Sequence, residues 1–330
     1  MNHTLDSNAF ARNKVDVKKS SPRKEPASIK DNPIIKDGGN FPFSPVLSIP
    51  LQTFTISPFE NIILKGQRGV KIHIEADSFV YMNGIPVKEP IEIELKEVYL
   101  KSGMIRENLT TTSNNQILES GGMIYLNATS YDENVSIRPD QPIHIEMAKS
   151  QNGLLPGMNI FNGQRYGTEA PINWTLNAER RLHRQANPNS ILRKRPFRSF
   201  RNQKGTSLAR GLNKYLFETN QLGWINCGKF QAEKEMTELT IIEATDATIE
   251  MKVVLKDFNT VLPVLKKEGK YVAPFVPIGE KVFVVGIGQV GEEIYLGIKE
   301  TVVQKDHEES LEFKLETPEN IRKKLKAINT

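Results

Sequence analysis

The chain has 330 residues, of which 38% are hydrophobic and 25% charged, an ordinary globular composition with enough core for two modest domains. The single cysteine, Cys227, excludes an intramolecular disulfide framework and a cysteine-based zinc site. The sequence contains no run of 18 apolar residues, so it does not predict a membrane-spanning helix. The net charge of +5 comes from one segment: the eleven Lys and Arg between Arg180 and Lys214 leave −6 for the rest of the chain.

Residues 1–40 are polar and rich in Lys, Ser, Asn and Pro, with little periodic apolar pattern. A segment of this kind buries too little apolar surface to fold, so we expect a disordered N-terminal arm. The arm also lacks the apolar run of a secretory signal. We therefore expect either a cytoplasmic protein or a periplasmic, cell-envelope protein whose leader has been removed.

The range 41–178 is dominated by a period of two. Val70, Ile72 and Ile74 alternate with polar residues, and the same alternation recurs in 91–96 and 143–147. This pattern puts one row of side chains into a core and the other into water, as in half-buried antiparallel strands. Asn83-Gly84 predicts a turn, and Gly121-Gly122 is expected to let the backbone turn where a Cβ would clash, so the range predicts a first β-sandwich domain.

Residues 179–214 form a basic segment with no sustained helical or strand period. Pro188, Pro196 and Gly205 interrupt it, and we interpret it as a long insertion or linker. Its cations are interleaved with aromatic side chains, so one hypothesis is that it binds phosphates and stacks on bases. A solvated loop or a protein contact is the alternative, and a charge run by itself favours that simpler interpretation.

A second series of strands is predicted between residues 215 and 316, spaced as in a second β-sandwich domain. Its first strand contains Trp224. We expect this side chain to be buried in the core of the second part; if it is exposed instead, we expect it to contact a partner. The range 317–330 predicts a C-terminal helix, because Thr317 fits the N-cap, Pro318 the first helical position, and Glu319 the first turn. The predicted fold is therefore all-β, with two sandwich-like domains and one short C-terminal helix.

Several motifs have simple structural explanations. Gly286–Gly291 matches the dinucleotide-binding fingerprint, but an alternating, strand-like segment follows it where a helix is required, so we expect a hairpin turn. His73 and His144 fall on the polar phase of their strands and are expected to be exposed; a metal site formed between them across a sheet is the minor alternative. Cys227 is expected to be a packed small hydrophobic residue.

The segment Gly69–Ala128 resembles the β-domain shared by zonula-occludens proteins, netrin receptors and ankyrins, in the divergent form found in many Bacteroidetes proteins. The matching stretches are GVKIHIEADSF, NGIPVKEPIEIELKE and LESGGMIYLNA, and LGWINCGKF is similar to a later tryptophan-rich strand. The resemblance covers roughly residues 60–300. It departs at Glu75, where the family has Pro, and at Gly228, where an Asp often stands.

The resemblance implies a β-sandwich that serves as a scaffold or binds a partner, commonly in the cell envelope. Some eukaryotic relatives cleave themselves at a His-Phe-Ser step, which is absent here. The sequence also contains no acid/base, nucleophile or metal constellation of the kind a catalytic site needs. We therefore expect a non-enzymatic scaffold or protein-interaction module without a cofactor, whose edge strands accept a strand from a protein partner.

The alternative hypothesis is a binder of anionic polymers, either nucleic acid or an acidic glycan or lipid, acting through residues 180–214. The candidate residues for partner or anion binding are Arg193, Lys194, Arg195, Arg198, Arg201 and Trp224.

Overall fold

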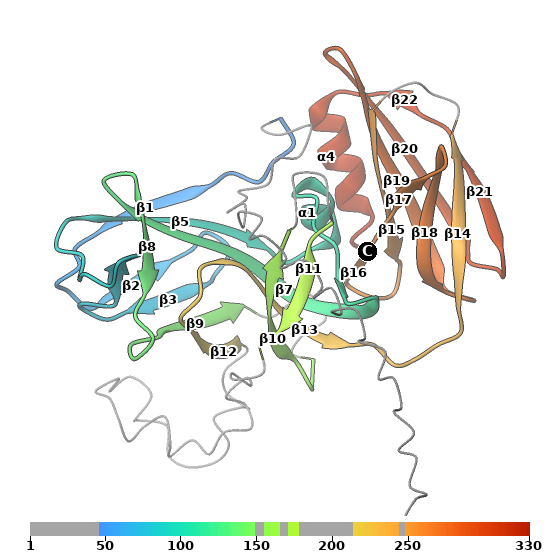
Figure 1. The fold of residues 1–330 in the computed structure, drawn as a ribbon. Coiled ribbons are helices and arrows are strands. Elements are labelled where there is room, and N and C mark those ends of the chain that lie inside the picture. Colours follow the sequence, from blue (N-terminus) through green and yellow to red (C-terminus); the bar gives the residue numbers. More distant parts are fainter. Residues whose placement is uncertain (1–45, 149–154, 166–170, 178–213, 244–247) are drawn as a thin grey trace, which may run out of the picture. The chain divides into compact units, whose positions relative to one another are not determined.

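The computed structural model describes residues 46–148, 155–165, 171–177, 214–243 and 248–330. The predicted arm, residues 1–40, and most of the basic segment lie outside these ranges. The prediction of an all-β fold with two sandwich-like parts and a C-terminal helix is confirmed (Figure 1).

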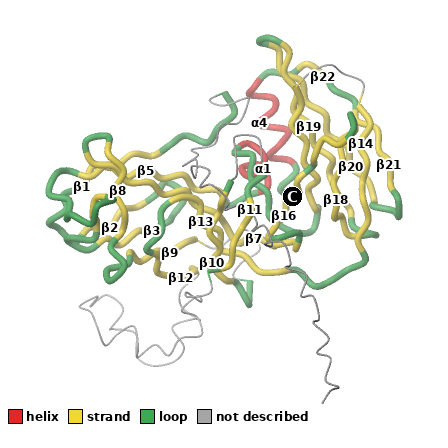
Figure 2. Tube along the Cα trace, in the orientation of Figure 1, coloured by secondary structure: helices red, strands yellow, loops and turns green. Residues whose placement is uncertain are grey.

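The strands of the first part are β1 (Gln52–Ile56), β2 (Ile62–Lys65), β3 (Lys71–Ile74), β4 (Phe79–Tyr81), β5 (Ile91–Val98), β6 (Thr112–Ser113), β7 (Gln116–Ser130), β8 (Glu133–Ile137), β9 (Ile143–Ala148), β10 (Asn159–Gln164), β11 (Asn173–Leu176), β12 (Lys214–Thr219) and β13 (Gly223–Phe230). Those of the second part are β14 (Met236–Glu243), β15 (Thr248–Leu255), β16 (Thr260–Pro263), β17 (Leu265–Lys267), β18 (Lys270–Pro277), β19 (Lys281–Val290), β20 (Glu293–Val302), β21 (His307–Leu311) and β22 (Lys314–Leu315). The helices are α1 (Lys101–Arg106) and α4 (Pro318–Ala327), drawn red in Figure 2.

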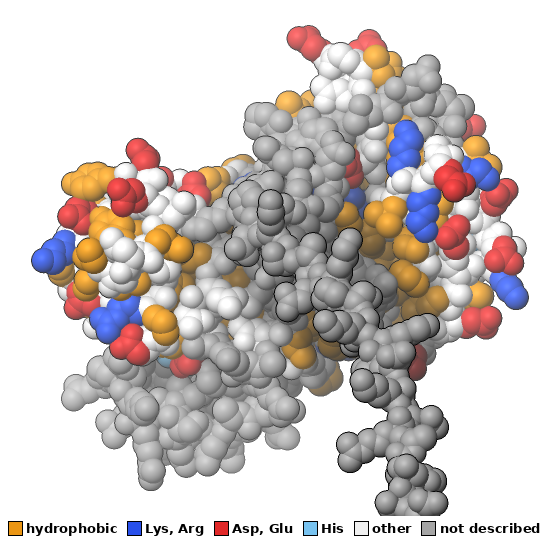
Figure 3. Space-filling model, viewed as in Figure 1, with side chains coloured by type: hydrophobic (Ala, Val, Ile, Leu, Met, Phe, Trp, Pro, Cys, Tyr) orange, Lys and Arg blue, Asp and Glu red, His pale blue; other side chains and the backbone are white. Residues whose placement is uncertain are grey.

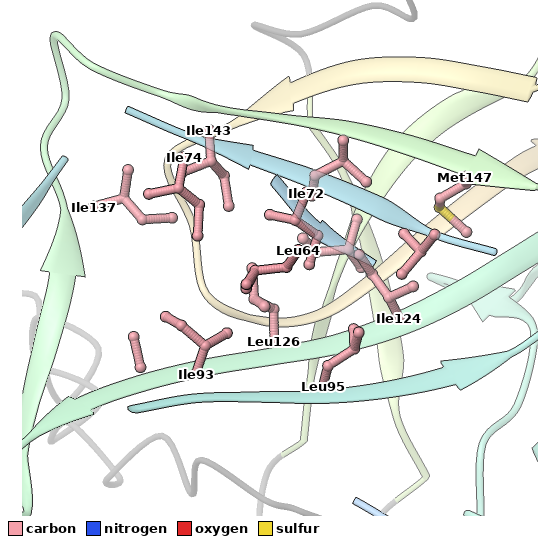
Figure 4. Close-up of a cluster of buried hydrophobic side chains, with 14 of the residues drawn as sticks. Leu64, Ile72, Ile74, Ile93, Leu95, Ile124, Leu126, Ile137, Ile143 and Met147 are labelled. Carbon is pink, nitrogen blue, oxygen red and sulfur yellow. The ribbon is translucent and has the colours of Figure 1, made fainter. Parts of the chain in front are cut away.

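Within the described residues, the first part contains two sheets. The larger runs β1-β5-β7-β13-β10-β11, with β4, β6 and β8 attached, and the smaller runs β12-β9-β3-β2. The alternation predicted from the sequence holds, because Ile72 and Ile145 from the smaller sheet meet Ile93 and Leu95 from the larger one in a common core. Figure 4 shows Ile72 of the smaller sheet and Ile93 and Leu95 of the larger one directed into the space between the two layers.

Strands β12 and β13 join the sheets of the first part although they follow the basic segment. Strand β12 pairs with β9, and β13 pairs with both β7 and β10. The predicted boundary at residue 215 therefore does not coincide with a boundary between sheets. Only the strands from β14 onward build the sheets of the second part, in the orders β17-β18-β14-β21 and β16-β15-β19-β20-β22. One pair in them, β14 with β21, is parallel.

A further core joins the two parts, so the larger sheet of the first part is covered on both faces. Trp174 and Trp224 pack there with Val285 of β19 and Leu325 of α4. Hydrogen bonds reinforce this junction: the amide of Thr111 donates to the carbonyl of Val261 over 2.7 Å. This double coverage explains why nearly every side chain of β7 is buried and why its sequence loses the strict period of two.

The two helices illustrate a confirmed prediction and a missed one. In α4 the side chain of Thr317 accepts a hydrogen bond from the amide of Asn320, and Pro318 occupies the first helical position, as predicted. Helix α1 was not anticipated, because it has only six residues and lacks a side-chain cap. The two helices meet where Asn329 donates to Ser102 Oγ over 2.9 Å.

Gly121 and Gly122 lie inside β7 rather than at a chain reversal. A Cβ on Gly121 would stand 2.9 Å from the Tyr215 ring, and Gly122 has a φ of +142° beside the Tyr99 ring. The pairing of β7 with β13 shifts at Cys227/Gly228, which marks a β-bulge. The glycines therefore allow aromatic side chains to approach the bulged strand.

Candidate functional site

The basic residues singled out in the sequence, Arg193, Lys194, Arg195, Arg198 and Arg201, lie outside the described residues. Lys214, the last cation of that segment, is described and lies 2.9 Å from Glu146 Oε2. Its charge is therefore already paired with a carboxylate of the neighbouring strand. Anion binding by the segment stays a prediction.

Trp224 lies in the core that joins the two parts and is only 6% exposed. Its ring stacks at a tilt on Tyr125, with 5.4 Å between the ring centroids. Its neighbours Ile225 and Cys227 point into the other core of the first part, as expected for a sheet covered on both faces. This geometry gives Trp224 a packing role, which is the buried alternative expected from the sequence, and partner binding by Trp224 stays a prediction.

His73 and His144 lie directly opposite each other on β3 and β9. His73 Nε2 is 2.8 Å from Glu146 Oε1, and His144 Nδ1 is 3.2 Å from Glu218 Oε1. The expectation that both are exposed is wrong for His73, which is 5% exposed because its carboxylate partner lets a polar group be buried. No group of three or more potential metal ligands is arranged to hold an ion within the described ranges.

Glu146 is at the centre of this network, because its carboxylate contacts both His73 and Lys214. The hydrogen bond from His73, together with the nearby Lys214, lowers the pKa of Glu146 from 4.5 to about 2. A carboxylate held ionised in this way, between His73 of β3 and Lys214 of β12, ties β3, β9 and β12 together. The arrangement is that of a stabilising ion-pair network across a sheet.

The fingerprint-like glycines take part in a hairpin, as the sequence indicates. Strand β20 follows β19 where a dinucleotide site requires a helix. Only Gly291, with a φ of +60°, occupies the turn, whereas Gly286 lies within β19, where a Cβ would stand 2.6 Å from the Phe313 ring. Cys227 is fully buried, and burial raises the pKa of its thiol, so it is the packed residue expected.

The feature best suited to bind a partner is β1, at one margin of the 9-stranded sheet (Figure 1). Among the described strands it pairs with β5 alone. Thr53 and Thr55 are exposed, Phe54 packs half-buried against the core, and Ile56 is buried. A margin strand of this kind offers one row of backbone N–H and C=O groups to an incoming strand.

Several other margin strands carry the features by which proteins discourage such pairing. Charged residues occur on β2, β12, β17, β21 and β22: Lys65, Lys214, Glu218, Lys266, Lys267, Glu308, Glu309 and Lys314. Strand β16 is covered, since Val261 accepts a hydrogen bond from Thr111 and is fully buried. Strand β11 is uncharged but is tied at Asn173, which accepts a hydrogen bond from the amide of Asn114 over 2.9 Å. Strand β1 has neither protection within the described residues.

Exposed apolar side chains gather on turns beyond the end of β1. Met82 and Tyr131 are 74% and 76% exposed, and Phe59 and Ile85 are 61% and 55% exposed. Their turns leave the same end of the sheet, where Ile56 of β1 pairs with the start of β5 and β5 pairs with the end of β7. Figure 3 shows hydrophobic, acidic and basic side chains interspersed at this end of the molecule, on the left of the view.

Comparisons with known proteins do not assign a family or a function to this chain. No family model matches this chain, and no curated protein matches it. The resemblance to the β-domain of zonula-occludens proteins, netrin receptors and ankyrins therefore stays a prediction. None of the helices in the described ranges has the length and apolar character needed to cross a membrane.

The alternation in the sequence predicts edge strands in general but does not distinguish β1 from the others. A signal was present: no charged residue occurs from Val46 to Phe59, and Pro50 and Pro58 bracket the strand. Alternation alone did not identify this strand as a margin, because its outer position depends on pairing with β5, 35 or more residues later in the chain.

Proposed function

We propose that this protein is a non-enzymatic protein-interaction module that takes an extended strand of a partner protein along β1. The observation that supports the proposal is an uncharged margin strand with two exposed threonines and a single neighbour among the described strands. In strand addition the main-chain hydrogen bonds supply affinity, and the alternating side chains supply specificity. We extend the proposal to a place in the cell envelope, as the sequence resemblance implies.

The flanking structure favours this mode of binding. Thr53 and Thr55 have a high β propensity, and Phe54 leaves part of its ring open at the rim of the core. A partner strand would therefore gain hydrogen bonds along one side and apolar contact at Phe54. The exposed side chains of Phe59 and Tyr131 lie beyond the strand and enlarge the apolar surface offered to the same partner.

The test is affinity capture from an extract of the source organism, followed by hydrogen exchange of the purified complex. We expect the captured partner to slow amide exchange within Gln52–Ile56. The double substitution Thr53→Lys/Thr55→Lys should weaken capture, because lysine on a margin strand discourages pairing. Thr175→Lys is the matched control, since Thr175 is exposed on β11 at the opposite margin of the same sheet.

Two results would overturn the proposal. One is a partner that binds as strongly to Thr53→Lys/Thr55→Lys as to the unaltered protein while leaving exchange in β1 unchanged. The other is turnover of a small metabolite by the purified protein, which would make it an enzyme.

A further inference from the structure

The register of β1 constrains the partner strand more narrowly than the proposed function states. Thr53 lies opposite Glu94, and Thr55 lies opposite Glu92, on β5. All four side chains are on the sheet face away from the first core, because the intervening residues Phe54, Ile91 and Ile93 pack into that core. The carboxylates of Glu92 and Glu94 therefore lie on β5, the strand next to the open edge strand β1.

The face of β1 and β5 that points away from the first core carries negative charge. Glu94 accepts a hydrogen bond from Asn127 Nδ2 over 3.0 Å, which holds its carboxylate on the face without neutralising it. Lys96, the next residue in the same row, is buried and paired with Glu107 at 2.7 Å. Glu92 is exposed. Lys96 is therefore paired with Glu107. The face beside β1 carries the negative charges of Glu92 and Glu94.

An incoming strand would lie about 5 Å from β1 and about 10 Å from β5, given the usual spacing of strands. Its side chains on the acidic face would stand beside Thr53 and Thr55, which are small. Lysine or arginine at these positions is long enough for its charged end to approach Glu94 or Glu92 across the threonine. Glutamate or aspartate there would be repelled.

The opposite face of the same strand has different requirements. Its side chains would stand beside Phe54, which is half-buried at the rim of the core, and beside Ile56, which is 5% exposed. Apolar residues at these positions would cover the open part of Phe54 and extend the core by one strand.

We propose, on the basis of the function proposed above, that β1 takes a partner strand in which apolar residues alternate with lysine or arginine. The apolar residues continue the core at Phe54, and the basic residues face Glu92 and Glu94. This chemistry distinguishes the partner from an acidic or a uniformly apolar strand.

The test uses three fluorescently labelled seven-residue peptides in which valine alternates with lysine, with threonine or with glutamate. Binding to the full chain is measured by fluorescence anisotropy, with hydrogen exchange of Gln52–Ile56 as the site readout. We expect the lysine peptide to bind about tenfold more tightly than the glutamate peptide, with an affinity that falls as salt is added. Glu92→Gln/Glu94→Gln should reduce this preference to about threefold or less.

Glu292→Gln/Glu293→Gln is the matched control, because it removes two adjacent exposed carboxylates from the turn that starts β20. It should leave the preference unchanged. If all three peptides protect β1 equally and Glu92→Gln/Glu94→Gln has no effect, strand addition stands and the basic-apolar specificity is wrong. If no peptide binds and captured proteins do not protect β1, both proposals are wrong.

Discussion

Lys96 Nζ lies 2.7 Å from Glu107 Oε2, and both side chains are almost completely buried. Glu107 also accepts hydrogen bonds from the Ser48 hydroxyl, over 2.8 Å, and from the amide of Ile49. One carboxylate therefore holds the end of α1, strand β5 and the segment that enters β1. The position of the proposed binding strand depends on this buried pair.

We predict that Glu107→Gln destabilises the protein by about 3–5 kcal/mol, because it leaves the Lys96 charge buried without its partner. Chemical denaturation followed by circular dichroism measures the loss. The double substitution Lys96→Met/Glu107→Leu should recover part of this stability, since it removes both charges. A loss below about 1 kcal/mol for Glu107→Gln would show that the pair contributes little.

The stability contributed by Glu146 should depend on pH. Its pKa is lowered to about 2 by His73 and then by Lys214, so its stabilising effect is complete above pH 4.5 and is lost as the pH falls toward 2. We expect the unaltered protein to lose on the order of 2 kcal/mol more than Glu146→Gln over this interval. Urea denaturation of both proteins at several pH values tests this, and parallel curves would contradict it.

Trp224→Ala should leave the protein insoluble or unfolded. The side chain is 6% exposed in the core between the two parts, and truncation of such a residue costs about 3–5 kcal/mol. Expression, solubility and thermal denaturation measure the outcome, and Trp224→Phe is the milder comparison. A soluble Trp224→Ala protein with an unchanged melting temperature would show that the ring is dispensable for the core.

Gly122→Ala should cost more stability than Gly157→Ala. Both glycines have a positive φ, but a Cβ on Gly122 would stand 2.6 Å from the Tyr99 ring, whereas nothing lies within 4 Å of one on Gly157. Strain alone costs about 1–2 kcal/mol, and the clash in β7 adds to it. Thermal denaturation of the two variants separates these effects; equal losses would mean that Tyr99 moves aside freely.

The amino-acid sequence by itself determined which segments are strands and where the last helix starts. The alternation of Ile91, Ile93 and Leu95 with charged residues predicts their burial, and the order Thr317-Pro318-Glu319 predicts the start of α4. These features are local, because each depends on a few consecutive residues and on the periodicity of one element.

Only the tertiary structure decided which strands are neighbours. It placed Trp224 beside Tyr125, although the basic segment separates their strands, and it buried His73 by bringing Glu146 within 2.8 Å. It also placed β1 at a margin with Glu92 and Glu94 one strand inward. A period of two shows which face of a strand is buried but not which strand lies beside it, because pairing depends on contacts between residues far apart in the chain.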